Sequence, residues 1–182
     1  MSLQVYLLDT NIASALWDSN NPYYEHARKF VEGLGENRVY ISRFVEAEIL
    51  YGHKVYAGSD LARRKIIEER MRVFPLVKDV DKHTAEPYSD IRAALFSKFG
   101  DRDREGKMKK KRPESLVDKT TSEQLQIQEN DLWMAAIAVQ HNMFLVSDDK
   151  MERIKEVWPA FNLIPWKPAP PPTAPVLPPP DA

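Results

Sequence analysis

Residues 4–9 have the sequence Gln-Val-Tyr-Leu-Leu-Asp, a short apolar run that ends in an acid. A surface strand would alternate polar and apolar residues, whereas this run is almost continuously apolar, which is typical of a strand covered on both faces in a parallel sheet. A helical pattern follows over residues 11–17. The stretch therefore predicts a buried first strand with Asp9 at its carboxyl end, followed directly by a helix.

The rest of the chain alternates strand and helix patterns in the same way. Further strands are expected at residues 38–42, 76–79, 143–147 and 162–165, of which 76–79 is the weakest. Helices are expected at residues 22–34, 43–52, 60–73, 81–99 and 131–141, with a short one near Lys150. This alternation predicts a three-layer α/β sandwich with a mainly parallel sheet. A chain of 182 residues has room for one such core, so we expect a single domain over residues 1–166.

Two segments depart from this pattern. Residues 101–125 are mostly charged or polar, with seven lysines or arginines between positions 102 and 112, and we expect a solvated insertion with almost nothing to bury. Residues 167–182 are rich in proline, which forbids helix and favours an extended conformation. We expect this tail to lie outside the fold, either as a ligand for an aromatic-lined groove or as a disordered end.

Composition excludes several classes of protein. The 26 basic and 27 acidic residues give a formal net charge of −1, so any binding of nucleic acid must depend on a local patch. The absence of cysteine excludes disulfides, thiolate metal sites and cysteine nucleophiles. No stretch approaches the roughly 18 apolar residues of a membrane span, and the first apolar run lacks the basic leader of a signal peptide. We therefore expect a cytoplasmic protein that does not contact membranes.

Acidic residues follow two of the predicted strands. Asp9 ends the first strand, and Asp148 and Asp149 come after the strand at residues 143–147. Because the carboxyl ends of parallel strands face a common crevice, these side chains are expected to meet there. Asn130 is a good N-cap, which would place Asp131 in the first turn of the next helix, where the helix dipole favours a carboxylate.

Glu48 joins this group through helical geometry. It lies beside the apolar stripe formed by Val45, Ile49 and Gly52, whereas Glu46 points roughly the other way. Any one of these acids alone is more often a helix cap or a surface charge. Four carboxylates in one crevice, however, repel each other by about 4 kcal/mol per pair at roughly 4 Å and an effective dielectric near 20, so a positive charge must compensate.

The ligand types decide which cation this would be. No histidine or cysteine stands beside the acids in the sequence, and an all-oxygen site favours Mg²⁺ or Mn²⁺ over zinc. Such ions bind phosphate oxygens and lower the pKa of a bound water, so the chemistry that fits best is hydrolysis of a phosphodiester.

Two other classes of protein also place acids at strand ends. An aspartyl-phosphate phosphatase would need a second aspartate two residues after the nucleophile, where this chain has Asn11, and a receiver domain would need a lysine after a late strand, where Lys150 follows two further acids. The other alternative is a catalytically silent module that uses the same fold to bind RNA or protein; the loss of an acid would favour it, and all four are present.

The order and surroundings of the acids resemble the PIN-domain family, and most closely the VapC-type toxin ribonucleases of toxin–antitoxin pairs. Four motifs carry the resemblance, which covers residues 3–100 and 126–166. They are Leu-Leu-Asp-Thr-Asn-Ile at 7–12, Ile-Ser at 41–42 with Ala-Glu-Ile-Leu-Tyr-Gly at 47–52, Asn-Asp-Leu at 130–132 with Ala-Ala-Ile-Ala at 135–138, and Leu-Val-Ser-Asp-Asp at 145–149.

This resemblance implies a PIN-like fold and a metal-dependent endoribonuclease, the toxin of a toxin–antitoxin pair. Its metal-binding and catalytic acids would be Asp9, Glu48, Asp131 and Asp149, holding Mg²⁺ or Mn²⁺, and the supporting residues would be Thr10, Asn11, Ser147 and Asp148. The implied substrate is single-stranded or loop RNA, including transfer RNA, and the implied partners are a small antitoxin and a second copy of the chain. The insertion and the tail make this chain longer than the usual compact toxin; the basic insertion either grips RNA phosphates or is simply a solvated loop.

Overall fold

A computed structural model describes residues 3–56, 61–75, 80–109 and 112–168. Its centre is a four-stranded sheet with the order β2-β1-β3-β4, formed by β1 (Val5–Leu8), β2 (Arg38–Ile41), β3 (Phe144–Val146) and β4 (Asn162–Ile164). Every pair of neighbouring strands is parallel. In the register, Leu8 pairs with Ile41 on one side and Val146 on the other, so the carboxyl ends of three strands lie level with Asp9.

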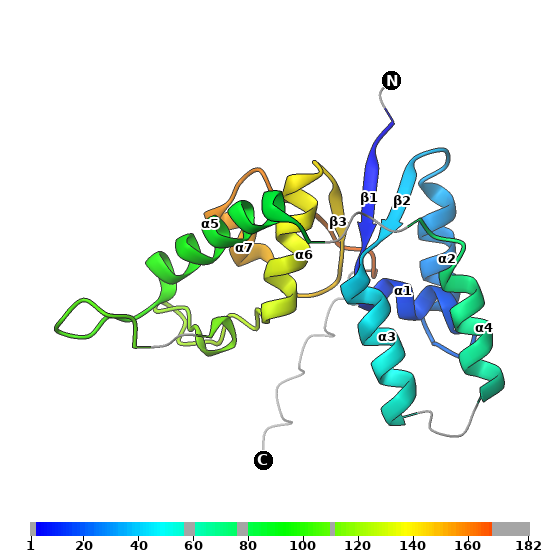
Figure 1. The fold of residues 1–182 in the computed structure, drawn as a ribbon, viewed down its shortest axis with the longest axis horizontal. Coiled ribbons are helices and arrows are strands. Elements are labelled where there is room, and N and C mark those ends of the chain that lie inside the picture. The colour runs from blue at the N-terminus through cyan, green and yellow to red at the C-terminus, as the bar shows by residue number, and fades with distance from the viewer. Residues whose placement is uncertain (1–2, 57–60, 76–79, 110–111, 169–182) are drawn as a thin grey trace, which may run out of the picture.

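Helices cover both faces of the sheet (Figure 1). One group consists of α1 (Thr10–Trp17), α2 (Tyr24–Gly33), α3 (Arg43–Tyr56) and α4 (Leu61–Met71), and α1 contacts the other three. The second group consists of α5 (Lys82–Phe99), α6 (Glu129–Gln140) and α7 (Glu152–Val157), in which α5 packs on both α6 and α7. The predicted three-layer α/β sandwich is confirmed, with a sheet that is wholly rather than mainly parallel.

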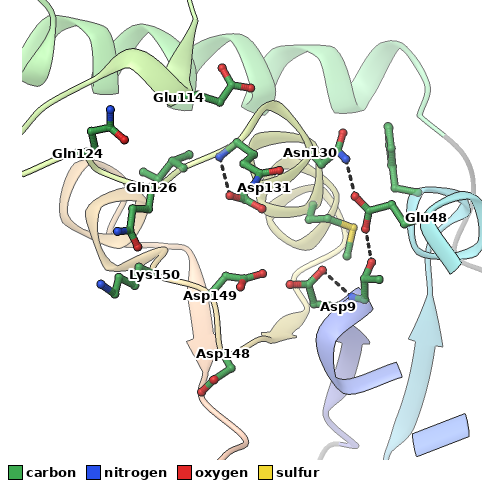
Figure 2. Close-up of a pocket in the computed structure, with 15 residues that line it drawn as sticks. Asp9, Glu48, Glu114, Gln124, Gln126, Asn130, Asp131, Asp148, Asp149 and Lys150 are labelled. Atoms are coloured by element: carbon green, nitrogen blue, oxygen red, sulfur yellow. Dashed lines mark hydrogen bonds between the residues drawn. The ribbon is translucent and has the colours of Figure 1, made fainter. Parts of the chain in front are cut away.

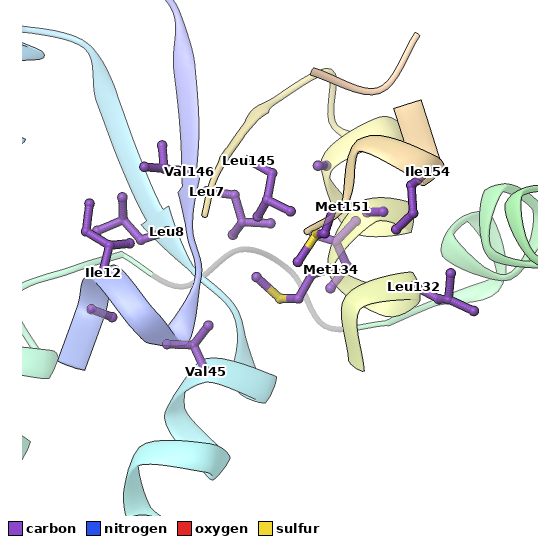
Figure 3. Close-up of a cluster of buried hydrophobic side chains, with 14 of the residues drawn as sticks. Leu7, Leu8, Ile12, Val45, Leu132, Met134, Leu145, Val146, Met151 and Ile154 are labelled. Atoms are coloured by element: carbon purple, nitrogen blue, oxygen red, sulfur yellow. The ribbon is translucent and has the colours of Figure 1, made fainter. Parts of the chain in front are cut away.

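The core explains why the first strand is continuously apolar. Leu7, Leu8, Leu145 and Val146 are fully buried in the middle of the sheet. Ile12 and Val45 pack from the side of α1 and α3, and a second set of side chains packs from the side of α6 and α7, namely Leu132, Met134, Met151 and Ile154 (Figure 3). A strand buried from both sides gains nothing from polar alternation, as the sequence predicted.

The predicted elements agree with the observed ones to within a few residues, with one correction at α6. Asn130 is not its N-cap: the helix begins at Glu129 with Gln128 as N-cap, and Asp131 accepts a hydrogen bond from the Gln128 N–H at 2.7 Å. Asp131 is the third residue of the helix, and its carboxylate accepts the N–H of the N-cap residue as in a capping box. The helix therefore starts earlier than predicted. The strand expected at residues 76–79 lies outside the described residues, as does the tail from residue 169.

The insertion is only partly solvated, contrary to expectation. Residues 101–107 are exposed, and this segment projects from the end of α5 (Figure 1). Leu116 and Leu125, however, are 0% and 5% exposed and belong to the core. Asp118 is also buried and pairs with Arg153 of α7. Leu116 and Leu125 are isolated apolar residues among charged ones in the sequence, so their burial in the core could not be predicted from a local pattern.

None of the helices in the described ranges combines the length and the apolar character that crossing a bilayer would require.

Candidate metal centre

A cavity of about 590 Å³ opens at the carboxyl end of β1 and β3 (Figure 2). Its charged lining consists of six acids and one lysine: Asp9, Glu48, Glu114, Asp131, Asp148, Asp149 and Lys150. The structure therefore brings the four predicted acids, which come from separate parts of the sequence, to the edge of one cavity. The strand ends supply Asp9 and Asp149, and α3 and α6 supply Glu48 and Asp131.

Asp9 is the most buried of these acids, at 6% exposed. One carboxylate oxygen accepts the Thr10 backbone N–H at 2.7 Å, and the other accepts the Ser147 hydroxyl at 2.6 Å. Burial raises the pKa of Asp9 to about 7; the Ser147 and Thr10 hydrogen bonds act in the opposite direction, and the charge of Asp149 raises it further. This carboxyl therefore keeps its proton to a higher pH than an exposed aspartate does.

Asn11 ties the two strand ends together. Its side-chain amide lies 3.2 Å from Asp9 Oδ2, 3.0 Å from Ser147 Oγ and 3.1 Å from Asp149 Oδ2. Its Oδ1 accepts the indole N–H of Trp166 at 2.7 Å, which fixes the orientation of the amide. Asn11 and Ser147 thus contact both the Asp9 carboxylate and each other.

Glu48 is held by one residue of α1 and one residue of α6. The Thr10 hydroxyl donates to Oε2, and the Asn130 amide donates to Oε1 at 2.5 Å. Glu46 instead pairs with Arg43 on its own helix and does not line the cavity. The distinction between the two glutamates that helical geometry predicted is therefore present in the structure.

Asp131 sits in the first turn of α6. Burial raises its pKa to about 6; the hydrogen bond from the Gln128 N–H lowers it, and the charges of Asp149, Glu48 and Glu114 raise it. Two of the four predicted acids thus have a raised pKa, with burial as the main cause in both.

Asp148 and Asp149 differ in direction although they are adjacent. Asp149 faces the other acids and contacts Asn11, whereas the Asp148 carboxylate points away from them and forms an ion pair with Lys167 at 2.7 Å (Figure 2). Asp148 therefore anchors the segment after β4 to the edge of the cavity.

The ligand types fit a hard divalent cation, because the cavity offers several carboxylates and no histidine. Across the part of the chain that the structure describes, no three His, Cys, Asp or Glu side chains are arranged to hold a metal ion as they stand. A cation would thus have to draw the carboxylates together. Its positive charge would offset the repulsion between them and stabilise the ionised forms of Asp9 and Asp131.

One wall of this cavity and two supporting residues were not predicted from the sequence. Glu114, Gln124, Gln126 and Gln128 line it from the insertion and the turn before α6, and Asn130 and Trp166 position acids or their neighbours. The alternation of glutamine with Leu125 and Ile127 was the signal that could have revealed the wall, since it is a strand-like pattern within an otherwise polar stretch.

The fold is an α/β sandwich with a parallel sheet, and its carboxylates gather at the carboxyl edge of that sheet. These two features define the class of protein as an α/β domain with an acidic site. Within that class the chain belongs to the PIN domain family, whose model matches residues 6–157. No curated protein matches the chain.

Solved structures of the same fold cover most of the chain. VapBC2 from Rickettsia felis, bound to a DNA fragment from its promoter, is 21% identical with a TM-score of 0.59, covering 90% of this chain and 100% of that one. VapBC-1 from nontypeable Haemophilus influenzae is 21% identical with a TM-score of 0.57, covering 90% and 98%. VapBC-5 from Mycobacterium tuberculosis, a member of the VapBC family of toxin–antitoxin systems, is 18% identical with a TM-score of 0.55, covering 88% and 98%.

Proposed function

We propose that this protein is a metal-dependent endoribonuclease that hydrolyses phosphodiester bonds in RNA. The observation that carries the proposal is the cavity at the sheet edge, whose charged lining is six acids and one lysine and where burial raises the pKa of both Asp9 and Asp131. Several carboxylates in one cavity, with Asp9 buried, repel one another unless a cation is present, and Mg²⁺ or Mn²⁺ is the cation that oxygen ligands prefer.

Asp9, Glu48, Asp131 and Asp149 would hold the ion. When bound, a divalent cation supplies positive charge to the phosphate and lowers the pKa of a water. Asp9 and Asp131 would bind the ion in their ionised forms, and Asn11 and Ser147 keep the Asp9 carboxylate oriented. The Thr10 hydroxyl and the Asn130 amide do the same for Glu48. Lys150, on the rim, offers the approaching RNA its positive charge.

A role as the toxin of a toxin–antitoxin pair is part of the proposal. It is supported by family membership and by the similarity of the fold to the VapBC proteins, one of which is described as belonging to toxin–antitoxin systems. The partner would be a small antitoxin, and an arginine of that partner would suit the acidic cavity, since guanidinium pairs well with carboxylates. A homodimer and transfer RNA as substrate remain predictions from the resemblance.

The test is cleavage of a mixed RNA pool that contains transfer RNA. Protein freed of any co-purifying partner is incubated with Mg²⁺, with Mn²⁺ or with chelator. Asp9→Asn, Asp131→Asn and Glu48→Gln are expected to abolish cleavage. Glu46→Gln is the matched control, because Glu46 lies on the same helix as Glu48 but outside the cavity, and it should cut like the wild type.

Cleavage that needs both the metal and the acids would support the nuclease. A folded wild-type protein that leaves all RNA intact under every metal condition would overturn it. Binding of RNA without cleavage would then favour a catalytically silent RNA-binding module.

A further inference from the structure

One wall of the acidic cavity is built from an alternating segment at residues 124–128. Leu125 and Ile127 are 5% and 0% exposed, whereas Gln124 and Gln126 are exposed and line the cavity. The two apolar side chains thus pack into the core, and the two amides line the acidic cavity. Gln124, Gln126 and Lys150 lie on one side of the cavity, opposite Glu48 and Asn130 (Figure 2).

The backbone of this segment is fixed in an unusual conformation. Gln126 has φ of 58°, in the left-handed region that residues other than glycine rarely adopt. The Leu125 N–H donates to the Leu116 carbonyl at 3.0 Å, which holds the segment against the buried part of the insertion. Residues in such conformations persist only where the surrounding structure imposes them, and they are common at binding sites.

A second cavity of about 480 Å³ shares part of its lining with the first. Its lining includes Gln124, Gln126 and Lys150, the same three residues that edge the acidic cavity. The two cavities therefore adjoin at these three side chains. Within the described residues neither Gln124 nor Gln126 makes a side-chain hydrogen bond, so both amides offer a donor and an acceptor to a ligand.

The chemistry of the two adjoining cavities favours the edge of a base over a phosphate. The second cavity has two basic residues, Lys150 and Arg153, and Arg153 is engaged by Asp118 and Glu156. The same cavity also presents acidic side chains, so it does not form a positive track for the RNA backbone. Neutral amides, in contrast, pair a donor and an acceptor with the edge of a nucleobase, and unstacked bases of single-stranded RNA expose those edges.

We propose that Gln124 and Gln126 form a nucleobase-binding subsite that selects a nucleotide beside the bond to be cut in single-stranded RNA. This inference rests on the proposed ribonuclease function. The subsite belongs to the insertion and the turn that follows it, so it would give this chain a base preference determined outside its four acids.

The first experiment maps the cleavage sites in the RNA pool by sequencing the new ends. The wild type is expected to show a preference for one base at a fixed position relative to the cut, and Gln124→Ala/Gln126→Ala should reduce that preference by at least about five-fold, the equivalent of one lost hydrogen bond. Glu105→Gln is the control. Glu105 lines neither cavity and lies in the exposed part of the insertion, so this variant should keep the wild-type preference. Gln126→Asn is a second variant, because asparagine tolerates the left-handed conformation while shortening the amide arm.

The second experiment measures binding without cleavage. Asp9→Asn protein is titrated into fluorescently labelled oligoadenylate, oligouridylate and oligocytidylate, and binding is followed by anisotropy. One oligonucleotide is expected to bind about ten-fold more tightly than the others, within the range that a bidentate amide–base contact provides. The two glutamine substitutions in the same background should make the three affinities nearly equal.

The two experiments separate this inference from the proposed function. If the wild type cuts nothing but binding is base-selective and depends on the glutamines, the nuclease fails and the subsite stands. If the wild type cuts RNA and the folded glutamine variants keep its base preference, the subsite is overturned. Equal affinities for all three oligonucleotides in the Asp9→Asn protein would overturn it too.

Discussion

Replacing Asp9 by asparagine should slightly destabilise the metal-free protein at low pH and stabilise it at high pH. Burial raises the pKa of Asp9 from 3.8 to about 7, so the folded protein binds this proton more tightly than the unfolded chain does. The resulting stabilisation is fully present below pH 3.8 and is lost as the pH rises through 7, the sign expected for an acid whose folded-state pKa is raised.

The size of the effect follows from linkage. Between about pH 5 and pH 8 the free energy of unfolding of the wild type should fall by about 2.5 kcal/mol through Asp9 alone. Asp131, with a pKa raised to about 6 for the same reason, adds a smaller loss over the same range. An asparagine side chain cannot ionise, so the Asp9→Asn variant avoids the first loss, although replacing the acceptor of the Ser147 hydroxyl costs about 1 kcal/mol at every pH.

The assay is urea denaturation with chelator present, at four pH values spaced from about 5 to about 8. The stability of Asp9→Asn relative to the wild type should rise by about 2.5 kcal/mol across this range. Asp90→Asn, which removes an exposed acid of α5, should track the wild type. A constant difference between wild type and Asp9→Asn at all of these pH values would refute the reasoning, because it would mean that the Asp9 carboxyl titrates alike in the folded and unfolded states.

Three further predictions concern the ion, the support behind the acids and the insertion. Mn²⁺ at about pH 8 should raise the Tm of the wild type and leave that of Asp131→Asn almost unchanged in thermal melts, because an ion held by these carboxylates would stabilise only the folded state. Trp166→Phe removes the donor to Asn11 and should lower kcat by about five-fold, the equivalent of one hydrogen bond, in the RNA cleavage assay; an unchanged kcat would show that the amide needs no such support. Leu116→Ala should lower the free energy of unfolding by about 3 kcal/mol in urea denaturation, since Leu116 is fully buried. An effect below about 0.5 kcal/mol, as expected at a surface position, would restore the view of the insertion as a solvated loop.

The sequence by itself determined the fold class and brought four acids forward as candidates for the site. The signals were local: a continuous apolar strand predicts a parallel sheet, and an acid directly after such a strand must lie at its carboxyl edge, as Asp9 does. Helical spacing distinguished Glu48 from Glu46 in the same way. These inferences succeeded because each depends on residues within a few positions of one another.

Only the tertiary structure decided the rest. Trp166 and Asn11 are 155 positions apart, and Asn130 and Glu48 are 82 apart, so no local pattern connects them. The cavity wall formed by Gln124 and Gln126 depends on the burial of Leu125 in the core. That burial could not be predicted from the polar and charged residues around Leu125 in the sequence. The raised pKa of Asp9 and of Asp131 likewise comes mainly from burial by residues distant in the chain. The sequence supplies the acids, and the long-range packing decides how deeply each is buried, what orients it and what shares its cavity.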